Sequence, residues 1–98
     1  MALPESETRL DKAELERLLR EGAWRRDGRT ITRTFALKGF KGAIAFVNRV
    51  AEAATAANHH PDIHVEGYRN VRIVLTTHAT GGISDADVAL ARTIEGFA

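Results

Sequence analysis

The dipeptide Asp27-Gly28 constrains the fold of this chain more than any other feature. It separates a short segment, 23–27, from a segment in which apolar residues alternate with threonines, 30–37. An Asp-Gly pair between such segments favours a two-residue hairpin loop, because both loop positions need positive φ. The sequence therefore predicts antiparallel strands at 23–27 and 30–37, with Arg33 interrupting the apolar face of the second strand.

A second alternating pair follows later in the chain. Apolar residues occupy alternate positions in 62–66 and again in 71–75, and the stretch 67–70 supplies a turn between them. We expect a second hairpin, whose second strand ends near His78 before the glycines at 81–82 break the chain.

Two earlier segments carry apolar residues at helical spacing. The first, 11–21, begins with Asp11 and Glu14 at the spacing of a capping box. The second, 39–57, is long and has a wide apolar face. That face is either core or a contact between subunits, because a small domain with excess apolar helix surface often oligomerises.

Clear stop and start signals bound the helices on either side of the second hairpin. Asn58 tolerates the left-handed conformation that ends a helix, and Pro61 prevents the helix from continuing. Ser84, with Asp87 three residues later, has the spacing of another capping box. We expect the last helix to follow this pair and to carry apolar positions as far as Phe97.

The predicted order of elements is α-β-β-α-β-β-α. Two hairpins and three helices predict an α+β fold, a four-stranded antiparallel sheet with the helices packed on one face. A chain of 98 residues fits a single domain, 1–98. The polar residues 1–9 are expected to be flexible.

Composition excludes several classes of function. The chain has no cysteine, so disulfides, thiolate metal sites and thiol nucleophiles are excluded. Its 14 basic and 13 acidic residues give a net charge of +1, which does not favour direct binding of nucleic acid. The sequence shows no signal-peptide pattern and no apolar run of about 18 residues, so we expect a cytoplasmic protein that does not bind membranes.

Histidines are the residues that point to chemistry. His59, His60 and His64 fall within six positions, and His78 ends the predicted fourth strand. Because the start of one hairpin strand lies beside the end of the other, His59, His60 and His78 are expected to meet at one end of the sheet. Imidazoles exchange protons near neutral pH, so such a group suits acid–base chemistry on a small molecule.

Other roles for these histidines stay open. Each could be a surface or capping residue, and His64 is expected to point outward from its strand. A zinc site is disfavoured, because Pro61 prevents the helix that would bring His60 and His64 together. Asp87 could be a helix cap or could orient an imidazole. Trp24 could be a core residue or an aromatic wall for a flat ring.

The spacing of these residues resembles a known family signature. His59-His60-Pro61 is followed after six residues by Tyr68, after nine more by His78 and after eight more by Asp87. This pattern is similar to that of the pterin-4a-carbinolamine dehydratases, and the likeness extends over nearly the whole chain from about Leu10.

The resemblance implies a function and a fold. The family has the same order of helices and strands, and it dehydrates 4a-hydroxytetrahydrobiopterin to quinonoid dihydrobiopterin in tetrahydrobiopterin recycling. It needs no metal and no organic cofactor. Members form dimers and tetramers, so a homodimer or homotetramer is expected. In animals one member is also a dimerisation partner of a homeodomain transcription factor, and some relatives have been linked to assembly of a carbon-fixing enzyme.

The resemblance also implies roles for individual residues. The catalytic residues carried over are His59, His60 and His78. The substrate-binding residues carried over are Asn58, Thr76, Thr77, Ala79, Trp24 and Asp87. At two positions, Thr55 and Ala79, the chain lacks a charged residue that is common in the family or in its animal members. These two departures favour one alternative, a non-catalytic dimerisation or assembly module of the same fold. A further alternative is a dehydratase acting on another pterin, which would keep the histidines but differ at the rim of the pocket.

Overall fold

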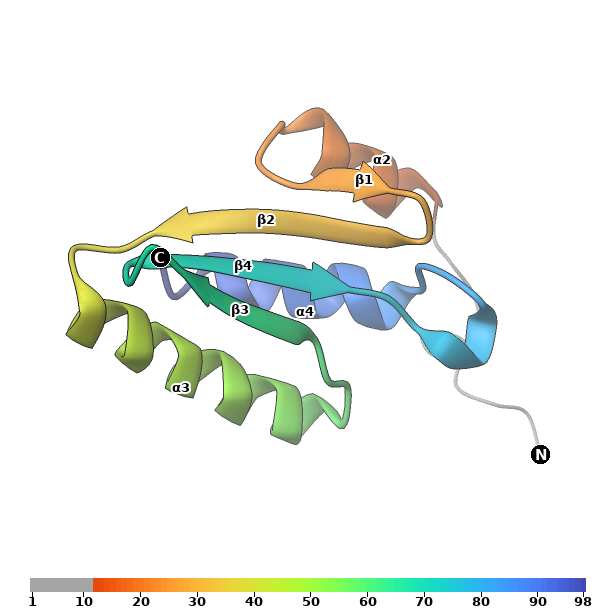
Figure 1. Cartoon of the computed structure of the whole chain (residues 1–98). Coiled ribbons are helices and arrows are strands. Elements are labelled where there is room, and N and C mark those ends of the chain that lie inside the picture. Colours follow the sequence, from red (N-terminus) through yellow and green to blue (C-terminus); the bar gives the residue numbers. More distant parts are fainter. Residues whose placement is uncertain (1–11) are drawn as a thin grey trace.

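The computed structural model describes residues 12–98, which form an α+β fold with helices packed on one face of a four-stranded antiparallel sheet (Figure 1). The strand order is β1-β2-β4-β3, so β2 and β4 occupy the centre. The expected flexible segment 1–9 and the predicted cap Asp11 lie outside the described residues. The elements are α2 (Lys12–Arg20), β1 (Arg25–Asp27), β2 (Thr30–Ala36), α3 (Phe40–Ala57), β3 (Asp62–Glu66), β4 (Asn70–Leu75), the short 3₁₀ helix η1 (His78–Thr80) and α4 (Asp85–Glu95).

The core lies between the sheet and the helices. In the central pair of strands Ile31 lies opposite Leu75 and Phe35 opposite Val71, and all four side chains are buried. Strand alternation puts every second residue of β2 and β4 on this face. The alternation predicted for β2 and β4 is therefore the pattern that builds the core, whereas the edge strands β1 and β3 contain no fully buried side chain.

Arg33 interrupts the apolar face of β2 without leaving an unpaired charge. Its guanidinium stacks over the Phe35 ring at 4.2 Å and pairs with Glu95 of α4 at 3.4 Å. The cation therefore lies between a core aromatic ring and the last residue of α4.

Helix α3 ends as its sequence predicts. Asn58 adopts the left-handed conformation, with φ 52° and ψ 42°, and its N–H bonds the carbonyl of Thr55 at 3.1 Å. The N–H of His59 bonds the carbonyl of Ala54 at 3.0 Å. These two bonds satisfy carbonyls at the helix end and fix the backbone from which the His59 side chain extends.

The structure corrects three predicted boundaries. The first strand begins at Arg25, because Ala23 and Trp24 follow the positive-φ turn at Gly22 and Trp24 turns into the core. The last helix ends at Glu95 and does not reach Phe97.

The fourth strand ends at Leu75, before the predicted end near His78. Thr77 exchanges backbone hydrogen bonds with Gly82 at 2.8 and 3.1 Å, which closes a loop around η1. Gly81 completes this loop with φ 72°. The backbone groups that would extend β4 are therefore used within the loop, and His78 begins a helical turn beyond the sheet.

Candidate active site

A buried carboxylate holds one histidine at the end of the sheet. The Nε2 atom of His59 lies 2.5 Å from Oδ1 of Asp87. Asp87 is 0% exposed, whereas the His59 side chain keeps 15% of its surface in contact with solvent. The pair therefore runs from the interior to the surface, with the acid at the buried end.

Asp87 is held by the first turn of α4 and by the loop after β4. Its Oδ2 accepts the backbone N–H of Ser84 at 2.9 Å, as expected of a capping box, and the hydroxyl of Thr77 at 2.7 Å. The hydroxyls of Thr77 and Ser84 lie 2.7 Å apart. The buried carboxylate is thus satisfied on both oxygens, as a buried polar group must be.

This arrangement orients the His59 imidazole. An ionised carboxylate only accepts hydrogen bonds, so Nε2 carries the proton that it shares with Asp87. The other ring nitrogen, Nδ1, has no hydrogen-bond partner among residues 12–98. Asp87 therefore leaves Nδ1 as the atom that can exchange a proton with a bound molecule.

His59 lines a cavity of about 190 Å³. The cavity lies between the end of α3, the loop after β4 and the first turn of α4. Alanine side chains at these helix ends leave room for a ligand, and Asn58 and Thr77 add polar groups. Its lining residues are Ala57, Asn58, His59, Thr77, Ala79 and Ala86.

A second cavity of about 320 Å³ adjoins the first, because Thr77 lines both. It lies between the β1–β2 hairpin and the loop around η1. The Thr76 hydroxyl joins this loop to the hairpin by donating to the Arg29 carbonyl at 2.6 Å. The residues that line it are Arg29, Thr30, Thr76, Thr77, His78, Gly81 and Gly82.

The structure brings most of the predicted site residues to this end of the sheet. Asn58, His59, Thr77 and Ala79 share the first cavity with Asp87 behind it, and Thr76 and His78 line the second. The roles carried over for these residues stay predictions.

Two predicted site residues lie apart from both cavities. His60 is exposed and lines neither, although it follows His59 directly. Trp24 is buried in the core, with its ring edge-on to Phe35 at a centroid distance of 6.1 Å. Its contact with substrate stays a prediction, as does that of His60.

Sequence reasoning missed four contributors to the site. The sequence marks Ser84 only as a helix cap, and its hydroxyl contact with Thr77 spans two different structural elements. Ala57 and Ala86 matter because they are small, which no motif marks. No motif marks Arg29 either, and its place beside His78 follows from the pairing of β2 with β4.

Neither a metal cluster nor a membrane helix is found in the described part of the chain. Residues 12–98 contain no group of three His, Cys, Asp or Glu side chains that could hold a metal ion. Among the helices of this range, none is both long and apolar enough to span a bilayer.

Comparison with known proteins gives a consistent set of relatives. The sequence model of a family described as pterin 4 alpha carbinolamine dehydratase matches residues 8–97. A protein of Thermomicrobium roseum is 51% identical over 87 residues, which cover 88% of this chain and 92% of that protein. One of Chloroflexus aurantiacus is 48% identical over 88 residues, covering 89% and 94%. Both carry the name "Putative pterin-4-alpha-carbinolamine dehydratase".

Solved structures agree with the sequence comparison. A transcriptional coactivator/pterin dehydratase from Brucella melitensis superposes with a TM-score of 0.80 at 34% identity, covering 93% of this chain and 99% of that chain. A pterin dehydratase-like RuBisCO assembly factor of the alpha-carboxysome superposes with a TM-score of 0.64 at 24% identity, covering 76% and 88%. The second likeness shows a shared fold only.

Proposed function

Because the chain belongs to the pterin-4a-carbinolamine dehydratase family, we propose that it dehydrates 4a-hydroxytetrahydrobiopterin to quinonoid dihydrobiopterin and water by histidine acid–base catalysis. The observation that carries this proposal is the His59 imidazole, held by buried Asp87 at the wall of a cavity. The reaction would serve tetrahydrobiopterin recycling.

The proposed reaction requires two proton transfers and no change of oxidation state. The C4a–O bond breaks with its electron pair, and a proton delivered to that oxygen lets it depart as water. The proton on the neighbouring ring nitrogen is removed, and the electron pair of the N–H bond forms the new C=N bond. One acid and one base, placed on different atoms of the pterin, therefore account for the reaction.

His59 is the proposed base. When Nδ1 takes the ring-nitrogen proton, the imidazole becomes a cation whose Nε2–H points at the Asp87 carboxylate. A buried carboxylate stabilises that cation as it forms and holds the ring in the required tautomer. Asp87 acts as a positioning residue in this scheme, because it reaches the substrate only through His59.

His78 is the proposed acid. It lines the adjoining cavity, which shares Thr77 with the His59 cavity. A pterin ring bound against Thr77 would therefore have His59 on one side and His78 on the other. Both histidines have solvent-exposed surface, which allows water to restore their protons after each turnover. His60 is proposed to hydrogen-bond the ligand from the exposed side.

Stopped-flow dehydration of 4a-hydroxytetrahydrobiopterin tests the proposal. His59→Ala and His78→Ala are each expected to lower the catalysed rate by about 10²–10⁴-fold, which is typical of a positioned acid or base. The matched control is His64→Ala, because His64 is an exposed histidine on β3 that lines neither cavity. Equal rates in the wild type, His59→Ala and His78→Ala would remove the assignment.

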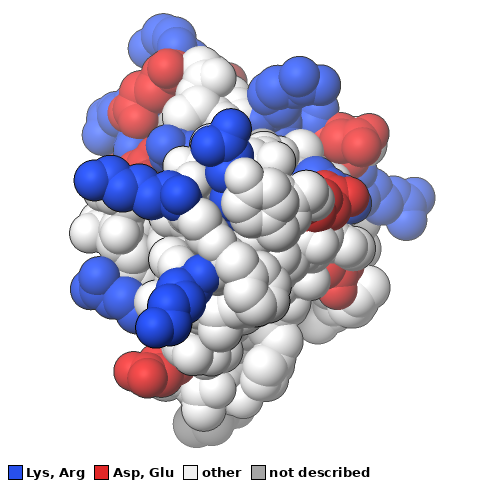
Figure 2. All heavy atoms as spheres, turned by 60° about the vertical axis from the view of Figure 1, so that its left-hand side comes forward, with Lys and Arg blue, Asp and Glu red and all other residues white. Residues whose placement is uncertain are grey.

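A second candidate function, a non-catalytic assembly module, is favoured by an exposed apolar patch. Phe40 is 58% exposed and Tyr68 62% exposed. Phe40 begins α3 and Tyr68 lies in the β3–β4 turn, and these two segments lie at the end of the molecule opposite η1 (Figure 1). Ile44 on α3 and Val65 on β3 are also exposed. Figure 2 shows an uncharged surface in the centre and lower part of this end, with charged side chains around it. Apolar patches of this kind mark interaction surfaces.

We propose that a second copy of this chain covers the patch in a homodimer or homotetramer. Sedimentation analysis of Phe40→Asp is expected to show a smaller assembly than that of the wild type. Its circular dichroism spectrum should match that of the wild type, because Phe40 is exposed within its own chain. An unchanged assembly would contradict this role. A stable assembly combined with absence of dehydration would favour the module over the enzyme.

A further inference from the structure

The cavity beside His78 differs in charge from the cavity beside His59. Its lining residues include Arg29 and His78, and no aspartate or glutamate. The His59 cavity has no lysine or arginine in its lining. A bound molecule that spans both cavities would therefore meet a positive charge at the Arg29 end.

Arg29 has no acidic partner within residues 12–98, although several other arginines do. Arg17, Arg33, Arg72 and Arg92 each pair with a glutamate. An arginine carries five N–H donors in a planar fork that matches carboxylate and phosphate oxygens. The free guanidinium is therefore available to a ligand anion.

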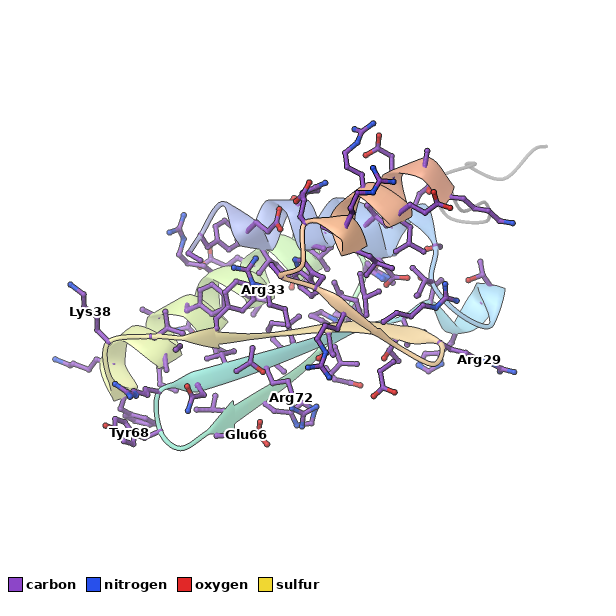
Figure 3. The ribbon with its side chains drawn as sticks, turned by 90° about the horizontal axis from the view of Figure 1, so that it is seen from above. Arg29, Arg33, Lys38, Glu66, Tyr68 and Arg72 are labelled. Carbon is purple, nitrogen blue, oxygen red and sulfur yellow. The ribbon has the colours of Figure 1, made fainter. Side chains whose placement is uncertain are left out.

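The fold holds Arg29 against the cavity through its backbone. The Thr76 hydroxyl bonds its carbonyl at 2.6 Å, and its Cβ lies close enough to Gly82 that a side chain there would touch it at 3.9 Å. Figure 3 shows Arg29 at the hairpin end nearest η1, with its side chain directed away from the sheet. The hairpin therefore places Arg29 beside the loop that carries His78.

We propose that Arg29 binds a phosphate carried on the side chain of the pterin substrate. This inference rests on the proposed function, in which His78 acts on the ring itself. A pterin ring in the His59 cavity, against Thr77, would direct a ring substituent into the adjoining cavity, where the guanidinium can donate to phosphate oxygens. The substrate class is then a 4a-hydroxytetrahydropterin with a phosphorylated side chain.

The test compares two substrates that differ only in a terminal phosphate on the side chain. Stopped-flow values of kcat/KM are measured for both with the wild type, Arg29→Gln and Arg25→Gln. Arg25 is the matched control, because it is an exposed arginine on the same hairpin that lines neither cavity. The wild type is expected to prefer the phosphorylated substrate by about three- to tenfold, the range for a partly exposed charge-assisted contact.

Arg29→Gln is expected to bring the ratio of the two kcat/KM values close to one, and Arg25→Gln is expected to keep the wild-type ratio. The preference should also shrink as salt is raised, because salt screens an exposed contact. A wild-type ratio near one would overturn the inference. So would a preference that Arg29→Gln leaves in place.

A binding measurement separates this inference from the proposed function. Fully oxidised pterins with and without the phosphate are titrated against the wild type and Arg29→Gln, and pterin fluorescence reports the Kd. If neither substrate is dehydrated, the proposed function fails, and tighter binding of the phosphorylated pterin by the wild type alone still supports the subsite. Equal Kd values would overturn it. Inorganic phosphate that binds at Arg29 without any preference for the phosphorylated pterin would overturn the assigned substrate class.

Discussion

Replacing Asp87 by asparagine separates the chemistry of the site from its packing. The side chain is fully buried and nearly constant in volume through the change. The amide oxygen can keep the hydrogen bonds that Oδ2 accepts from Thr77 and Ser84. The amide nitrogen then faces Nε2 of His59, and two donors cannot bond each other. We expect His59 to move its proton to Nδ1, so that the atom facing the cavity can no longer act as a base.

The contacts of Asp87 indicate how large the losses of catalytic rate and of folding stability should be. A serine-protease histidine held in the wrong tautomer by the same substitution loses about 10⁴-fold in kcat, so Asp87→Asn is expected to cost about 10²–10⁴-fold here. Hydrogen bonds to a charged partner contribute about 1.5–3 kcal/mol and neutral ones about 0.5–1.5 kcal/mol. Because two of the three bonds survive in neutral form, we expect a loss of about 1–3 kcal/mol of stability.

Three measurements check this prediction. Stopped-flow dehydration gives the rate, urea unfolding gives the stability, and ¹⁵N NMR shifts of His59 report which nitrogen carries the proton. The control Ser84→Ala weakens the same helix cap by about 1 kcal/mol and should leave the His59 tautomer unchanged. Wild-type turnover in Asp87→Asn, with Nε2 still protonated, would refute the reasoning.

Further predictions concern stability, measured by urea unfolding. The hydrogen bond from Arg92 holds the pKa of Glu21 below its ordinary value of 4.5. The stabilisation is therefore present above pH 4.5 and lost as the pH falls through the lower folded value, so Glu21→Gln should be less stable than wild type at pH 7, and this difference in stability should shrink as the pH falls below 4.5. Ile73→Ala, at a fully buried central position, should cost about 2–5 kcal/mol. Gly81→Ala should cost roughly 1–2 kcal/mol, because φ is +72° and nothing else obstructs a Cβ. Gly42→Ala should stabilise α3 by about 0.5–1 kcal/mol, since its Cβ would make only an ordinary 3.9 Å contact with Leu37, and a loss would contradict this.

The fold could be predicted from the sequence because its signals are local. The left-handed Asn58 and the pair Ser84 and Asp87 each act within a few residues, and each marks a boundary that the structure keeps. The predicted extension of the fourth strand failed for the opposite reason. Thr77 bonds Gly82 in a loop closure, which competes with strand pairing and leaves no periodic pattern.

The first hairpin forms as predicted, but its two loop residues are Gly28 and Arg29. The predicted loop Asp27-Gly28 is therefore wrong by one residue, because Asp27 pairs with Thr30 at the end of β1 and only Gly28 of the predicted pair has positive φ.

The candidate site could be predicted only in part. The meeting of segment 58–60 with segment 76–78 follows from hairpin geometry, which sequence reveals. The bond between His59 and Asp87 joins residues 28 positions apart. The capping-box spacing alone accounts for an acid at position 87, so the sequence does not require a bond to His59. His60 lies in the exposed stretch between α3 and β3 and lines neither cavity, which its adjacency to His59 in the sequence does not reveal.

Asp87 serves both the helix cap and the imidazole, and this limits which substitutions the protein can accept during evolution. One oxygen begins the last helix and the other steadies the imidazole, so loss of the acid harms folding and chemistry together. A descendant that abandoned the reaction could replace the histidine at 59 by another hydrogen-bond donor to Asp87 but would be selected to retain the acid. Within such lineages the aspartate marks ancestry of the architecture, and the histidine is the better indicator of whether the reaction persists.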